Sequence, residues 1–191
     1  MLNNMSNDEN KIGGMQGKIL VVNLNESKTY EINLDKNLIA KFLGGRGLGA
    51  YFLSKHVDPE TDPLSKENKL IFMNGPLAGS LIPGNNKVCV TFKSPLTNTY
   101  SYSLCGGHWG PELKFAGFDG LIIEGKAKEP VYLWIHDEVE VKSAEKVWGK
   151  TIPHAEGMIR TEIEDDGRAQ IALIGPSGEK KAKYATITSG L

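Results

Sequence analysis

Hydrophobic and polar residues alternate along several short stretches of the chain, and a period of two predicts β-strands. The first two stretches, 17–25 and 27–34, meet at a short turn and therefore predict a β-hairpin. The clearest hairpin is predicted over 129–144, where two alternating segments flank the polar residues at 136–138. Further strands are expected at 69–76, 87–93, 121–123, 169–176 and 182–189.

Segments with apolar residues at helical spacing lie between these strands. The first helix is predicted over 35–43, with Asp35 as its N-cap and Leu38, Ile39 and Phe42 on one face. Further helices are expected at 50–57, 111–116 and 154–166. Because strands dominate and pair as hairpins, the pattern predicts an α+β fold built on antiparallel sheets rather than a doubly wound parallel sheet.

Two segments of the chain share one pattern. KLIFMNGPLAG contains Gly75–Pro76, and AQIALIGPSGE contains Gly175–Pro176. Each continues into an alternating strand led by a lysine, KVCVTFK or KYATITS. One interpretation is chance, because Gly-Pro ends many strands. The other is a duplicated β-unit, which predicts pseudo-twofold symmetry within the fold.

The composition argues against several classes of protein. The 191 residues suit one domain, and 22 Lys plus Arg against 23 Asp plus Glu lack the basic excess of a nucleic-acid-binding surface. No run of 18 apolar residues is present, so no membrane span is expected. Residues 1–15 are polar and predict a disordered tail ahead of a domain at 16–191. We expect a cytoplasmic protein in which Cys89 and Cys105 are free thiols.

The glycine-rich segment GGRGLG at 44–49 is the first candidate for a ligand-binding loop. It lacks the strict spacing of a dinucleotide-binding loop and follows a predicted helix rather than a strand. A turn between two helices is the simpler interpretation. Arg46 still offers a fixed positive charge with forked donors that could reach an anion.

Two further loops could hold a ligand. The loop at 80–87 is typical of an ordinary turn, although its backbone N–H groups and Lys87 could bind a phosphate. In CGGHWGPELK, at 105–114, two glycines permit close backbone approach before a helix start. Trp109 is interpreted as a packing residue. A cysteine hydrolase with Cys105 as nucleophile and His108 as base is one alternative.

Several motifs together resemble one family. DPLSKENKLIF at 62–72, KSPLT at 93–97 and GPELKFAGFD at 110–119 look like the N-terminal domain of the tungsten-containing aldehyde:ferredoxin oxidoreductases, over roughly residues 16–190. The resemblance implies two antiparallel sheets with pseudo-twofold symmetry, on which a bis-pterin cofactor lies. It also implies tungsten, or molybdenum in some relatives, and a nearby [4Fe–4S] cluster. Family members oxidise aldehydes to carboxylic acids and pass the electrons to ferredoxin.

The resemblance implies site residues only where positions match. Lys87 stands where the family has an arginine that contacts a pterin phosphate, so charge is kept and bidentate geometry is lost. Leu104, Cys105, Gly106 and Gly107 match an Asn-Ser-Gly-Gly loop that contacts the pterin. The backbone carbonyl of Leu104 is the expected ligand of a magnesium ion that bridges the two pterins.

The largest departure from the family is length. The cluster cysteines, the residues near the metal and the substrate pocket belong to later domains of the family, so we expect no catalytic residue here and no turnover by this chain alone. Expected partners are the remainder of the oxidoreductase, on the same or a separate chain, ferredoxin, and a second copy of the chain. The alternative is a non-catalytic scaffold that has lost pterin binding, which the changes at 87, 104 and 105 favour.

Overall fold

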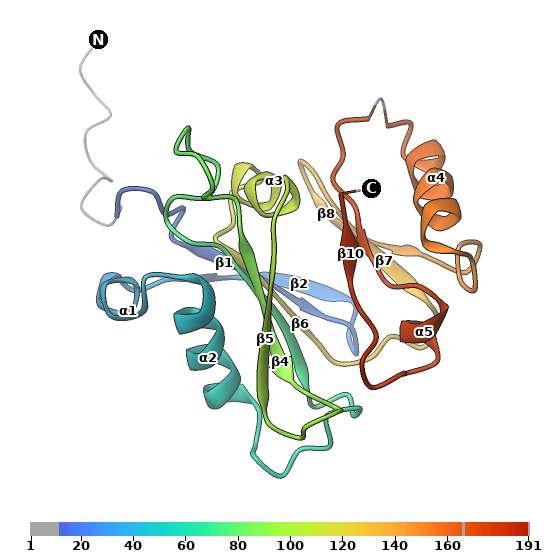
Figure 1. Cartoon of the computed structure of the whole chain (residues 1–191), viewed down its shortest axis with the longest axis horizontal. Coiled ribbons are helices and arrows are strands. Elements are labelled where there is room, and N and C mark those ends of the chain that lie inside the picture. Colours follow the sequence, from blue (N-terminus) through green and yellow to red (C-terminus); the bar gives the residue numbers. More distant parts are fainter. Residues whose placement is uncertain (1–11, 166, 191) are drawn as a thin grey trace.

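The computed structural model describes residues 12–165 and 167–190. A six-stranded sheet forms its centre (Figure 1). The spatial order is β2 (Lys28–Asn33), β1 (Lys18–Asn23), β6 (Gly120–Glu124), β3 (Lys69–Met73), β4 (Val88–Lys93) and β5 (Tyr100–Cys105). Every neighbouring pair is antiparallel except β1 and β6, which are parallel.

Helices α1 (Lys36–Phe42) and α2 (Gly45–His56) cover one face of this sheet, on the left in Figure 1. Side chains alternate between the faces of a strand, so the sheet contributes to two cores. Ile19 and Val21 of β1 pack with Leu48 and Phe52 of α2 in the first core. Leu20 and Val22 of β1 point the opposite way, into the second core.

The second core lies between the sheet and the rest of the chain. Helix α3 (Trp109–Phe115) contributes Leu113, and Trp109 packs on Phe72 with ring centroids 4.9 Å apart. Trp109 is therefore a packing residue, as predicted. The second half of the chain packs here as well, through side chains that include Leu133, Ile135 and Ile187.

The second half of the chain forms two small antiparallel sheets in place of one large one. The hairpin β7 (Val131–Ile135) and β8 (Val139–Ser143) is followed by α4 (Ile152–Glu162). The strands β9 (Ala172–Leu173) and β10 (Thr188–Ser189) pair with each other, and α5 (Pro176–Glu179) lies between them in sequence. No strand among the described residues joins the two pairs.

The α+β class and most of the predicted elements are confirmed. Asp35 caps α1 by accepting from the N–H groups of Asn37 at 2.8 Å and Leu38 at 3.2 Å. The prediction of purely antiparallel sheets is wrong, because the chain returns through α3 and inserts β6 beside β1 in the same direction. The strands predicted at 169–176 and 182–189 shrink to two residues each.

The beginning of the chain is described only in part. Residues 1–11, most of the predicted tail, lie outside the described residues. Residues 12–15 are described, and Met15 is buried in the first core, so packing begins just before the predicted boundary at 16. Across the described ranges, no helix is both long and apolar enough to cross a bilayer.

Candidate functional site

Four segments of the chain meet at one end of the six-stranded sheet. β3 ends at Met73 opposite Cys89 of β4, and Met73 also lies opposite Gly120, where β6 begins. β5 ends at Cys105, opposite Val88. The start of α2 joins the same end, because the N–H of Gly45 donates to the carbonyl of Asn74 at 3.0 Å. The three predicted ligand loops, at 44–49, 80–87 and 105–114, thus converge although they are far from adjacent in sequence.

Lys87 and the Gly106–Gly107 loop are brought side by side. Because Val88 pairs with Cys105, the residues just outside this pair, Lys87 and Gly106, lie next to each other at the end of β4 and β5. Lys87 is exposed and makes no hydrogen bond or ion pair within the described ranges. A free cation therefore stands beside the predicted glycine loop.

The two loop glycines leave their backbone open. A Cβ added at Gly106 or Gly107 would meet no atom within 4 Å. Gly107 has φ +85°, a conformation that favours glycine over every residue with a Cβ. The loop can thus present bare backbone to a bound group, and contact with a cofactor stays a prediction.

Leu104 and Arg46 lie on the face of the sheet that α2 covers, at the same end of the sheet. Leu104 pairs with Cys89, and a Cβ added at Gly45, beside Arg46, would lie 3.9 Å from the Cβ of Cys89. Arg46 Nη1 donates to the Tyr102 hydroxyl at 2.8 Å, and the guanidinium lies 4.9 Å from the Tyr102 ring centroid. Arg46 has no acidic partner in the described part of the chain.

An exposed apolar strip runs along β5 beneath Arg46. Tyr100, Tyr102 and Leu104 alternate along the strand and so point to one face. They are 43%, 41% and 49% exposed, because α2 packs mainly on β3 and β4. We call these three side chains the β5 strip. A flat apolar group could stack there next to two cations.

Cys105 points away from the β5 strip. It follows Leu104 in the strand, so its side chain faces the second core, and its Sγ lies 3.4 Å from the carbonyl of Gly106. Cys89 lies on the opposite face, and both thiols are free. The expected free cysteines are thus present, and Cys105 offers the open side of the loop only its backbone.

The glycines of GGRGLG serve close packing. Gly44 is the N-cap of α2, and the following glycines lie in its first turns. A Cβ at Gly47 would come within 2.4 Å of the Phe42 carbonyl, and one at Gly49 within 2.4 Å of Thr91 Oγ1. The clash at Gly49 would push α2 off β4, and the clash at Gly47 would push it away from the end of α1. The predicted junction between two helices is confirmed, with α2 starting at Gly45 rather than at 50.

A buried polar network behind the loops was not predicted. Lys114 Nζ donates to the carbonyls of Gly75 at 2.9 Å and Pro76 at 3.0 Å. The Asp119 carboxylate accepts from the N–H groups of Gln16 at 3.0 Å and Gly17 at 2.7 Å. Both charged residues belong to GPELKFAGFD, so this motif fixes the site end of the sheet. In the sequence, both charged residues interrupt otherwise apolar segments, and this interruption could have indicated that their side chains are buried.

Asn74 completes this network at the start of the loop after β3. Its Nδ2 donates to the carbonyl of Gly110 at 2.9 Å, while its Oδ1 is buried without a hydrogen-bond partner. A Cβ at Gly110 would lie 2.7 Å from that Oδ1, so the motif needs glycine there. In the described residues, no group of three His, Cys, Asp or Glu side chains could hold a metal ion.

The comparison with known proteins matches this chain to one family over almost its whole length. Residues 19–190 match the family described as aldehyde ferredoxin oxidoreductase, N-terminal domain. The tungsten-containing aldehyde ferredoxin oxidoreductase of Pyrococcus abyssi is 49% identical over 175 residues, which cover 91% of this chain and 29% of that protein. The aliphatic sulfonate oxidoreductase, WOR-like subunit, of Pyrococcus furiosus is 40% identical over a match that covers 92% of this chain and 30% of that protein.

A solved structure shows the same fold. The active site complex BamBC of benzoyl coenzyme A reductase, in complex with 1,5-dienoyl-CoA, superposes with a TM-score of 0.90 at 39% identity. The match covers 93% of this chain and 27% of that one. This chain thus spans under a third of the length of these relatives. From the family match and these identities, the chain belongs to the aldehyde ferredoxin oxidoreductase family, by its N-terminal domain.

Proposed function

We propose that this chain supplies one wall of the bis-pterin metal site of an aldehyde:ferredoxin oxidoreductase-type enzyme. In that enzyme an aldehyde is oxidised to a carboxylic acid and the electrons pass to ferredoxin. The observation that carries the proposal is the meeting of Lys87, Arg46 and the open Gly106–Gly107 backbone at one sheet end. Tungsten, or molybdenum, held by the pterins would supply the redox chemistry.

The relatives support a role in holding the cofactor rather than in choosing the substrate. Matching domains occur in proteins named for aldehydes, for aliphatic sulfonates and for benzoyl coenzyme A. A domain retained across such different substrates serves something that these enzymes share. In this proposal, substrate choice and the [4Fe–4S] cluster belong to the portion of the enzyme beyond this domain.

The residues at the sheet end fit a pterin better than a bare metal. Pterin phosphates are anions, and Lys87 and Arg46 are cations without acidic partners in the described chain. The fused pterin ring is flat, and the β5 strip offers it exposed aromatic surface. Since the described side chains hold no metal-binding cluster, the metal would be bound by the cofactor's own sulfur atoms.

Each residue has a separate role in this proposal. Lys87 binds a phosphate as a point charge, and Gly106 and Gly107 let the backbone approach the cofactor. Leu104 would offer its backbone carbonyl to the magnesium ion of the cofactor. The Cys105 side chain takes no part, because it faces the second core.

The test is the pterin and tungsten content of the protein purified without oxygen from cells supplied with tungstate. The Lys87→Ala variant should lose about tenfold in both, as expected for one charged hydrogen bond of about 1.5 kcal/mol. Lys128→Ala is the matched control, because Lys128 is exposed and follows β6 at the opposite end of the sheet. Equal retention in the two variants would remove Lys87 from the site.

The second candidate is a non-catalytic scaffold without cofactor. It is favoured by the leucine and cysteine that replace polar family residues at 104 and 105, since neither side chain forms a hydrogen bond outside the loop. Wild-type protein that carries neither pterin nor tungsten, with or without its partner polypeptide, would support the scaffold and contradict the cofactor wall.

A further inference from the structure

The side chain of Arg46 is held at both of its ends. Beside it, the N–H of Gly45 donates to the carbonyl of Asn74 at 3.0 Å, which ties the start of α2 to the end of β3. At its tip, Nη1 donates to the Tyr102 hydroxyl at 2.8 Å, and the guanidinium lies 4.9 Å from the Tyr102 ring centroid. The guanidinium therefore rests over β5, although Arg46 is exposed to solvent.

The strand register places Tyr102 on the face of β5 that lies toward α2. Val88 and Cys105 form a pair and both face the second core, so Leu104, the preceding residue of β5, faces the opposite way. Tyr102 is two residues from Leu104 and shares its face. The ring of Tyr100 lies beside it, with the two centroids 6.1 Å apart. Tyr102 thus forms a platform for Arg46 at the edge of the sheet.

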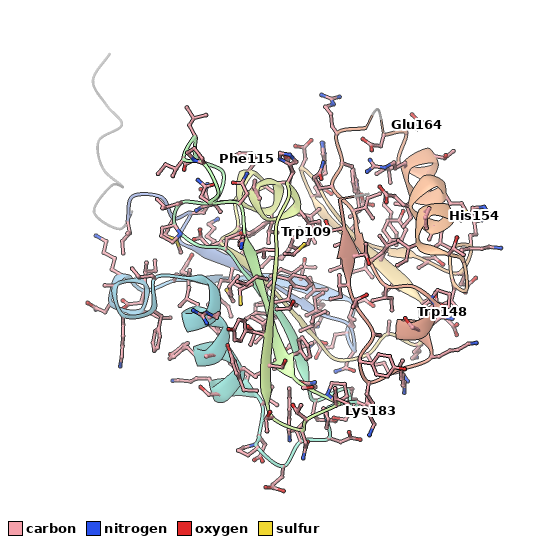
Figure 2. All side chains as sticks on the ribbon, viewed as in Figure 1. Trp109, Phe115, Trp148, His154, Glu164 and Lys183 are labelled. Carbon is pink, nitrogen blue, oxygen red and sulfur yellow. The ribbon has the colours of Figure 1, made fainter. Side chains whose placement is uncertain are left out.

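The aromatic side chains of α3 leave this pair open to solvent. Trp109 and Phe115 lie at α3, apart from α2, in Figure 2, and Trp109 packs on Phe72 in the second core. Both Arg46 and Tyr102 are exposed. A ligand can therefore reach the guanidinium from solvent while the ring stays beneath it.

Most of the donors on the Arg46 guanidinium are unused. Tyr102 accepts from Nη1, and within residues 12–165 and 167–190 the edge formed by Nε and Nη2 donates no hydrogen bond. No carboxylate of these residues forms an ion pair with Arg46. Two parallel N–H groups on one planar edge match two oxygen atoms of a phosphate. The free edge of Arg46 therefore has the geometry for a two-point contact.

Lys87 cannot supply a contact of this kind. Its ammonium group is a point charge with rotatable donors, so it attracts a phosphate without fixing the orientation of that group. The resemblance to the family places an arginine at this position, and its forked donors are lost here. Arg46, which joins the same end of the sheet, keeps a fork. It can therefore provide the orientation that Lys87 does not.

We propose that Tyr102 is a positioning residue, which holds Arg46 so that its free edge binds a phosphate monoester at two points. The inference rests on the proposed function, in which this phosphate belongs to the pterin cofactor. A side chain that is already held loses less conformational freedom when it binds, which strengthens the contact. Lys87 attracts the phosphate, and Arg46 fixes its orientation.

The first test uses protein without pterin, and inorganic phosphate is the probe. The NMR signal of the Arg46 Nε–H group, assigned by its absence in Arg46→Lys, should be sharp and should shift as phosphate is added. Tyr102→Leu should broaden this signal and weaken phosphate binding, measured at the backbone amides of 44–48, about three- to fivefold. Tyr102→Phe keeps the ring and should have a smaller effect. Tyr184→Leu, at an exposed tyrosine of the second half, is the control and should match wild type.

A double-mutant cycle separates positioning from a general structural effect. Arg46→Lys keeps the charge and removes the fork, so phosphate binding should weaken about tenfold. If Tyr102 acts through Arg46, Tyr102→Leu should have little further effect in the Arg46→Ala background. An undiminished effect of Tyr102→Leu in that background would contradict the positioning role. An Arg46 signal that phosphate does not shift would overturn the phosphate contact.

Pterin content distinguishes a failure of this inference from a failure of the proposed function. In protein purified without oxygen from cells supplied with tungstate, Arg46→Lys and Tyr102→Leu should lower pterin content in the same order as phosphate affinity. A phosphate response at Gly106 and Gly107 that leaves the Arg46 signal unchanged would overturn the inference and agree with the role of Lys87. Wild-type protein without pterin would contradict the proposed function, and the phosphate titration would still decide whether Tyr102 positions Arg46.

Discussion

Lys114 on α3 donates a hydrogen bond to the carbonyl oxygen of Gly75, 39 residues earlier, at 2.9 Å. The same Nζ reaches the carbonyl of Pro76 at 3.0 Å. Gly75 and Pro76 begin the loop that leads to Lys87, so the buried lysine fixes one side of the candidate cofactor site. The motif GPELKFAGFD, which helps to identify the family, thus supports the candidate site through a buried side chain that does not line it.

Replacement of Lys114 by methionine should destabilise the protein. Lys114→Met keeps most of the buried volume and leaves two carbonyl groups without their donor, which costs about 1.5–3 kcal/mol for a charged hydrogen bond. Urea denaturation should show this loss at pH 7. Lys183→Met, at an exposed lysine of the second half, is the control and should change stability by less than about 0.5 kcal/mol. A Lys114→Met variant as stable as the control would contradict the structural role.

The Lys114 contribution should also depend on pH. Burial lowers the pKa of Lys114, and the charge of Asp119 opposes this effect. The unfolded chain therefore binds the proton more tightly than the folded chain, so stability rises as pH increases through the folded pKa toward the ordinary value of 10.5. The stability difference between wild type and Lys114→Met should widen over that interval. A constant difference would show that the lysine is not held in a desolvated place.

The sequence predicted elements better than it predicted how they assemble. Alternation located the hairpins, and Asp35 located the start of α1, because both signals depend on neighbours in sequence. The parallel pairing of β1 with β6 depends on contacts about 100 residues apart, which a local pattern does not encode. The strands at 169–176 and 182–189 were predicted too long because strand length depends on a neighbouring strand as well as on propensity.

In the candidate site too, the sequence predicted which residues belong to it better than it predicted how their side chains are oriented. Spacing and resemblance selected Lys87, Arg46 and the loop at 104–107. The strand register brings Lys87 and the loop to one sheet end, and the start of α2, with Arg46, joins the same end. The pattern could not tell that the Cys105 side chain faces away, because this follows from which side of β5 packs on the second core. Asn74, Lys114 and Asp119 were missed because buried polar residues resemble surface residues until their partners are known.

Because α2 packs closely on β4, replacement of Gly49 by alanine should destabilise the protein. Gly49→Ala places a Cβ 2.4 Å from Thr91 Oγ1 and should cost about 1–3 kcal/mol through overpacking. Gly157→Ala on α4 is the matched control, because its Cβ would meet nothing within 4 Å. Alanine is the better helix former, so the control should gain up to about 1 kcal/mol. Thermal denaturation of both variants tests the contrast, and equal melting temperatures would contradict it.

Asp165 predicts a loss of stability in acid. Hydrogen bonds from the backbone N–H of Ala169, and then from Arg160, hold the pKa of Asp165 below its ordinary value of 3.8. A depressed carboxyl pKa contributes stability above the unfolded value, and this contribution is lost as pH falls through the folded pKa. Asp165→Asn should therefore be less stable than wild type at pH 7, and the difference should vanish in strong acid. The neighbouring Glu164→Gln is the control and should change stability at pH 7 by less than about 0.5 kcal/mol.

The two cysteines should react very differently with iodoacetamide. Cys89 is 1% exposed, and burial raises the pKa of its thiol, so it should be alkylated only after unfolding. Cys105 is partly exposed and should be labelled once in the native protein, as Cys105→Ala would confirm by mass spectrometry. We expect a single labelling phase that His108→Ala leaves unchanged. A fast phase near neutral pH that disappears in His108→Ala would contradict this prediction and support the cysteine hydrolase alternative.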